Sequence, residues 1–175
     1  MSMAYLCGWV GPVDESDDPY PSESWSSSPS EVAIQKHTQQ VLVIPGKISA
    51  TDNAAIKQIV MDHGAMYVSF YYDAEYYNST HSTYYYTGSS AKNHAVVIVG
   101  WNDEFDRTKF STTAPANGAY IIKNSWGTEW GDNGFFYVSY CDTKFSSGDM
   151  FCFLNAETTD NYNTIYQHDP RGWIS

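Results

Sequence analysis

The chain has 175 residues, and its 20 Asp and Glu residues outnumber its 9 Lys and Arg residues, which gives a formal net charge of −11 at pH 7. A protein that binds nucleic acid needs clustered basic side chains to displace counterions, so this charge balance excludes nucleic acid as a partner. Hydrophobic residues make up 42% of the chain and aromatic residues 17%, which excludes a disordered acidic tail and requires a packed core.

The first part of the chain is predicted to be an irregular segment that wraps around another part of the protein. Residues that favour turns are frequent in it, yet Trp9, Tyr20 and Trp25 are too large and apolar for a solvated linker. A short strand is expected at residues 40–44, directly before a Pro-Gly pair.

A helix is predicted next, with Thr51 or Asp52 as its N-cap and Gly64 as its end. The stripe with helical spacing consists of Ile56, Ile59, Val60 and His63. Strands are then expected at residues 66–72, 95–101, 119–123 and 135–140. One helix followed by several strands predicts an α+β fold with a mainly antiparallel sheet.

Two polar stretches separate these strands. Seven tyrosines stand among Ser, Thr, Asn and Gly residues over positions 71–86, a composition that favours an amphipathic surface loop over a core strand. The second stretch, residues 102–118, carries the acidic residues Asp103, Glu104 and Asp106 and is interpreted as a solvated loop.

Two further segments carry residues that are typical of catalysis. His94 begins an apolar strand that reads His-Ala-Val-Val-Ile-Val-Gly-Trp; taken alone, such a histidine is more often structural than catalytic. The other segment, residues 123–134, reads Lys-Asn-Ser-Trp-Gly-Thr-Glu-Trp-Gly-Asp-Asn-Gly and follows a second apolar strand.

Together the two segments resemble the second half of the papain-like cysteine peptidases. The resemblance implies that His94 is the catalytic histidine, that Asn124 orients it and that Trp126 covers their contact. In a Cys-His enzyme the imidazole holds the thiol's proton and later donates it to the leaving amine, while an amide oxygen fixes the tautomer without adding charge. The implied fold is the papain-like α+β fold, mainly its barrel-like right subdomain, with the helical, cysteine-bearing subdomain largely missing.

The family's nucleophile has no identified counterpart. It stands about 130–150 residues before the histidine, whereas only 93 residues precede His94. Cys7 has faintly similar neighbours but lacks a following helix to lower a thiol pKa, while Cys141 and Cys152 follow the asparagine. The family's oxyanion-hole glutamine is also without a counterpart, so the chain alone is predicted not to hydrolyse peptides.

Both ends of the chain resemble parts of larger, multidomain family members, the C-terminal end resembling a connector to a lectin-like domain. Three regions are therefore predicted: an inter-subdomain segment at residues 1–50, the His/Asn subdomain at 51–156 and the start of the connector at 157–175. These resemblances predict a truncated chain, marginally stable when isolated.

The leading hypothesis is a piece of a papain-like endopeptidase that acts on a peptide or protein substrate. A non-catalytic peptide- or glycan-binding module and one half of a split peptidase are the alternatives. No membrane span is expected, because the longest apolar run is far shorter than the roughly 20 residues required. No cofactor is expected either, since the Cys and His spacing matches no metal site, and family analogy favours an extracellular or cell-surface location.

Overall fold

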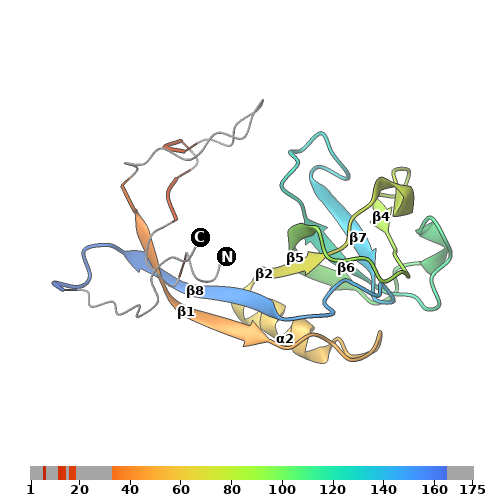
Figure 1. The fold of residues 1–175 in the computed structure, drawn as a ribbon, viewed down its shortest axis with the longest axis horizontal. Helices are drawn as coiled ribbons and strands as arrows, with labels where there is room; N and C mark the ends of the chain where they lie inside the picture. The colour runs from red at the N-terminus through yellow and green to blue at the C-terminus, as the bar shows by residue number, and fades with distance from the viewer. Residues whose placement is uncertain (1–5, 7–11, 15, 19–32, 165–175) are drawn as a thin grey trace. The chain divides into compact units, whose positions relative to one another are not determined.

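The structure is a computed structural model that describes residues 6, 12–14, 16–18 and 33–164 (Figure 1). The predictions for Cys7, for the wrapping aromatic residues before position 33 and for the connector after position 164 lie outside the described residues. Two compact units are present: Leu42–Cys152 forms one, and the two flanking segments of the chain form the other. The side-chain contacts described below belong to the Leu42–Cys152 unit.

The strands and the helix follow the predicted order along the chain. The strands are β1 (Lys36–Ile44), β2 (Met66–Phe70), β3 (Tyr77–Asn78), β4 (Thr83–Tyr84), β5 (His94–Asn102), β6 (Ala119–Lys123), β7 (Phe135–Ser139) and β8 (Met150–Thr158). The helix is α2 (Ala54–His63), and short 3-10 turns lie at Ala74–Tyr76 and Arg107–Lys109. Every strand predicted from the sequence is confirmed; the bounds of β6 agree with the prediction, and the other strands differ at one or both ends.

The sheet has the strand order β1-β8-β2-β5-β6-β7-β4-β3. The pairs formed by β2 with β5 and β8, by β6 with β5 and β7, and by β3 with β4 are antiparallel. The pair of β4 and β7 is parallel. The predicted α+β class with a mainly antiparallel sheet is therefore confirmed.

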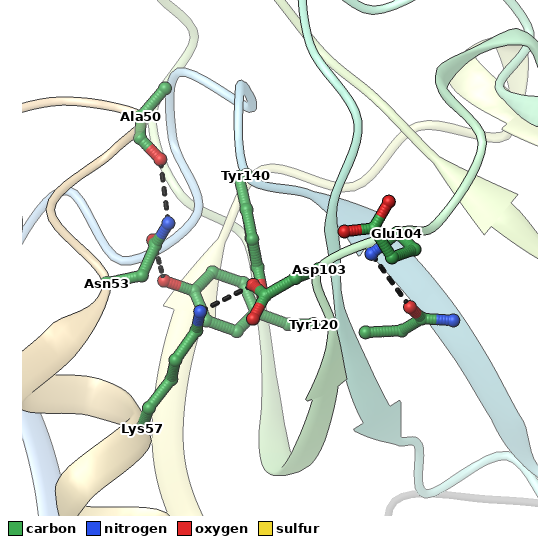
Figure 2. A network of polar contacts seen from close by, with 8 residues as sticks. Ala50, Asn53, Lys57, Asp103, Glu104, Tyr120 and Tyr140 are labelled. Carbon is green, nitrogen blue, oxygen red and sulfur yellow. Dashed lines mark hydrogen bonds and ion pairs between the residues drawn. The ribbon is translucent and has the colours of Figure 1, made fainter.

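The start of helix α2 differs from the prediction. Asn53, rather than Thr51 or Asp52, is the N-cap residue. The carboxylate of Asp52 accepts a hydrogen bond from the backbone N–H of Ile48, at 3.2 Å, and is committed to the preceding turn. Asn53 is buried, and its side chain donates to the carbonyl of Ala50 at 2.8 Å and accepts from a tyrosine hydroxyl of the sheet (Figure 2).

The rest of the helix follows the predicted pattern in part. Ile56 and Val60 are buried, but His63 is exposed and does not belong to the apolar stripe. Gly64 ends the helix as predicted, with φ of 88° and its N–H donating to the carbonyl of Val60 at 3.0 Å. Glycine adopts this left-handed backbone without the steric cost of a Cβ.

The acidic loop after β5 is attached to helix α2. Asp103 is 54% exposed, as a solvated loop implies, yet its carboxylate accepts hydrogen bonds from Lys57 Nζ at 2.5 Å and from the Tyr140 hydroxyl at 2.9 Å (Figure 2). These two hydrogen bonds lower the pKa of Asp103. The same loop contributes Phe105 and Phe110 to a small second core.

The tyrosine-rich segment is not the surface loop that its composition favours. Tyr84, Tyr85 and Tyr86 are buried, so that prediction is wrong for these three residues. Two of their hydroxyls have partners that the composition does not reveal: the Tyr84 hydroxyl donates to the carbonyl of Tyr71 at 2.8 Å, and the Tyr86 hydroxyl bonds Ser90 at 2.8 Å. Buried tyrosines are stable where the hydroxyl finds such a partner.

Candidate active site

His94 is the first residue of β5, which lies between β2 and β6 in the sheet (Figure 1). On one side it pairs with Phe70 of β2. On the other side, Val97 pairs with Lys123, the last residue of β6. Continuing this antiparallel register past the end of β6 brings position 126 opposite His94. The sheet therefore delivers Asn124 and Trp126 to the start of β5.

A hydrogen bond joins the two predicted polar residues. His94 Nε2 lies 2.9 Å from Asn124 Oδ1, and the backbone N–H of Ser125 donates to the same oxygen, also at 2.9 Å. A backbone N–H is always a donor, so this contact fixes which end of the Asn124 amide is oxygen. Because that oxygen only accepts, Nε2 of His94 carries the hydrogen. In the neutral ring this leaves Nδ1 as the basic nitrogen, and no hydrogen bond between described residues engages it.

Asn124 is buried and held by the loop that follows β6. It is only 8% exposed, and its backbone N–H donates to the carbonyl of Gly134 at 2.9 Å, which closes the loop that follows β6. Its Nδ2 is buried without a partner among the described residues. The hydrogen bonds of the Asn124 side chain with described residues are therefore all made by Oδ1. Within the Asn124 side chain, Oδ1 is therefore the atom that meets the His94 ring.

Trp126 covers the contact. Its indole stacks on the His94 ring at 4.6 Å between centroids and an interplanar angle of 24°, while 41% of the residue stays exposed. A cover of this kind excludes water and strengthens the hydrogen bond beneath it. Gly131 allows the tight loop behind it, with φ of 67° and a backbone oxygen of Phe135 only 2.4 Å from where a Cβ would stand.

Two residues beside His94 have no sequence signal that predicts them. Asn93 extends the pairing of β2 with β5 by one residue: its Oδ1 accepts from the Tyr72 N–H at 2.7 Å and its Nδ2 donates to the Tyr72 carbonyl at 2.9 Å. The Tyr72 ring stands edge-on to His94, with centroids 5.9 Å apart. Asn93 directly precedes the histidine, which is the one hint that the sequence offers, whereas the contacts of Tyr72 depend on tertiary packing.

The two described cysteines lie away from His94. Cys152 is buried in β8, and its Sγ lies 3.6 Å from the carbonyl of Ala65, at the end of β2 remote from His94 by roughly 16 Å of strand. Burial also raises the pKa of the Cys152 thiol, which disfavours a thiolate. Cys141 packs against the second core, which includes Ala119 at the end of β6 remote from Lys123.

The described residues offer no site for a metal ion. Within this part of the chain, no group of three or more His, Cys, Asp or Glu side chains is placed to hold one. Among the described helices, none has the length and apolar character needed to span a bilayer.

A family model described as papain family cysteine protease matches residues 2–152. The chain belongs to the papain family. Mouse (Mus musculus) cathepsin J is 37% identical over 70 residues, which are 40% of this chain and 17% of cathepsin J. The gamete and mating-type specific protein A of Dictyostelium discoideum is 30% identical over 131 residues, which are 71% of this chain and 24% of that protein. The chain thus spans about a quarter or less of these relatives.

A solved structure of another papain-family protein covers nearly all of this chain. The cysteine protease and lectin-like domains of Cwp84, a surface layer associated protein of Clostridium difficile, superpose with a TM-score of 0.82 and 28% identity, over 95% of this chain and 38% of that one. A mite allergen structure matches with a TM-score of 0.57 at 20% identity and supports the fold alone. The predicted family, its papain-like fold and the likeness to members with a lectin-like domain are confirmed; the roles of His94, Asn124 and Trp126 stay predictions.

Proposed function

We propose that this chain supplies the histidine and the orienting asparagine of a peptidase that cleaves peptide bonds in protein substrates by a Cys-His-Asn mechanism. The observation that carries the proposal is the 2.9 Å contact between His94 Nε2 and Asn124 Oδ1 beneath the indole of Trp126. Membership of the papain family supports the same reaction class.

The chemistry follows from the tautomer. With the Nε2 hydrogen donated to Asn124, Nδ1 of His94 has the free lone pair that accepts a proton from a cysteine thiol. The resulting thiolate attacks the substrate carbonyl, and the imidazolium returns the proton from Nδ1 to the leaving amine. Throughout this cycle Asn124 keeps the ring plane fixed, because its oxygen is itself held by the Ser125 N–H.

We further propose that the 175-residue chain is inactive by itself and gains activity when a cysteine-bearing part of the enzyme, on the same or a second polypeptide, docks against it. Two observations support this: Cys152 is buried and remote from His94, and Cys141 packs against the second core. The alternative of a binding module loses a support, because three of the tyrosines that would form its recognition surface are buried.

The test combines a fluorogenic peptide assay with an epoxysuccinyl probe that labels activated thiols. The chain alone is expected to be neither active nor labelled, while a mixture with a folded cysteine-bearing subdomain of the family becomes active. In that mixture His94→Ala lowers kcat/KM by about 10²- to 10⁴-fold. The matched control His63→Ala, at an exposed position of α2, leaves it unchanged. Rapid labelling of the chain alone at Cys7, Cys141 or Cys152, or full activity of His94→Ala, contradicts the proposal.

A further inference from the structure

The indole of Trp126 is held by other aromatic rings rather than by deep burial. Besides His94 it contacts Trp130, edge-on at 4.9 Å and 88°, and Tyr72, edge-on at 4.9 Å and 81°. Since 41% of Trp126 is exposed, its position over the histidine depends on these flanking rings.

Tyr72 is the flanking ring that comes from outside the loop of Trp126. Its backbone is tied on both sides, by its N–H and its carbonyl, to the Asn93 side chain. Its hydroxyl takes part in no hydrogen bond between described residues. The contribution of this side chain at the site is therefore the ring itself, which touches both Trp126 and His94.

Tyr84 packs against the ring of Tyr72. The two rings stack with centroids 5.3 Å apart and an interplanar angle of 22°, and Tyr84 is fully buried in β4. Its hydroxyl donates to the carbonyl of Tyr71 at 2.8 Å and accepts from the Asp73 N–H at 3.3 Å. Tyr84 thus fixes Tyr72 through its ring face and through the backbone on either side. Its strand is in turn paired with β7, opposite Val138.

We propose that Tyr72 and Tyr84 are positioning residues that brace Trp126 over the His94–Asn124 hydrogen bond and keep water from the Nε2 hydrogen. The brace gives part of the tyrosine-rich segment a function beyond filling the core. The inference rests on the proposed role of His94, but its readout is a proton of the isolated chain, so it succeeds or fails independently of peptide hydrolysis.

The experiment measures how fast the Nε2 hydrogen of His94 exchanges with solvent, by NMR of the folded chain. Tyr72→Leu keeps an apolar side chain but removes the ring, and the exchange is expected to become about five- to tenfold faster. Tyr84→Phe keeps the stacked ring but frees the backbone around Tyr72, and we expect a smaller acceleration of about two- to threefold. Backbone amides of β5 and β6 serve as an internal reference and keep their exchange rates.

Two matched variants separate bracing from general loosening. Tyr72→Phe retains the ring and is expected to leave the exchange rate unchanged. Tyr76→Ala removes a ring from the same segment that contacts Tyr86 rather than Trp126, and is expected to leave it unchanged as well. Exchange in both Tyr72→Leu and Tyr84→Phe within about twofold of the parent chain, or equal acceleration by Tyr76→Ala, overturns the proposal.

Discussion

Asp142 joins the tyrosine-rich segment to the turn that follows β7. Its buried carboxylate accepts backbone hydrogen bonds from Tyr86 at 2.9 Å, Lys144 at 2.8 Å and Phe145 at 2.7 Å. Asp142→Asn replaces one accepting oxygen with a donor and leaves a buried N–H unpaired, so we expect a loss of about 1–3 kcal/mol in the free energy of unfolding. Urea denaturation measures this. Asp149→Asn, at an exposed position, is the control, and an equal effect of the two changes contradicts the argument.

For individual residues, the sequence predicts those that belong to a local motif and misses those whose contacts form only in the folded chain. His94, Asn124 and Trp126 stand in segments with a recognisable order of residues, and the structure brings all three together. Tyr72 gives no such signal, because its contacts join the segment after β2 to a loop more than fifty residues later. Asp142 gives none either, because a carboxylate that accepts backbone hydrogen bonds looks like any other Asp in the sequence.

The loop after β6 places Trp126 over the His94 ring. Two glycines of this loop provide a matched pair of variants. Gly131 and Gly127 both have positive φ, of 67° and 81°, but only at Gly131 would a Cβ meet another backbone atom. Gly127→Ala is expected to cost about 1–2 kcal/mol from the left-handed backbone alone. Gly131→Ala is expected to cost more and to shift the tryptophan fluorescence, because the clash with Phe135 displaces the loop. Equal costs in thermal or urea unfolding would show that the close approach is unimportant.

Strands with regular apolar patterns could be predicted from the sequence, as β5, β6 and β7 show. The strand β8 was not predictable in this way, because its first residues, Met-Phe-Cys-Phe-Leu, are apolar without alternation and its last residues are exposed. The short strands β3 and β4 could not be predicted from the sequence for another reason. Each is only two residues long, and they join the sheet because β4 pairs with β7, which is distant in the sequence.

In the molecule as a whole, the stability depends on pH through two groups of opposite charge, the buried Asp142 carboxylate and the half-buried Lys47 ammonium. Burial raises the pKa of Asp142 to about 6, so its contribution to stability is present at low pH and lost as pH rises through about 6. Burial lowers the pKa of Lys47 to about 8. Its contribution is present above the unfolded value of 10.5 and is lost as pH falls through about 8.

Lys47→Met isolates the second of these effects. The Nζ of Lys47 donates to the Tyr140 carbonyl at 2.5 Å and lies 5.2 Å from the centroid of the Tyr120 ring. Between about pH 8 and 10 the unfolded chain binds more protons than the folded one, so the stability of the parent chain relative to Lys47→Met should rise, by at most about 1.4 kcal/mol per pH unit. A difference that is flat or falling across this range in urea titrations contradicts the burial of the charge.

We propose that Asn124 orients His94 so that Nδ1 is free to accept a thiol proton. The most direct measurement is the tautomer of the His94 ring, by ¹⁵N NMR of the folded chain at about pH 9, where imidazoles are neutral. We expect a hydrogen on Nε2 and none on Nδ1, with the preference lost in Asn124→Ala. A hydrogen on Nδ1 in the parent chain, or the same tautomer preference in Asn124→Ala, would contradict it.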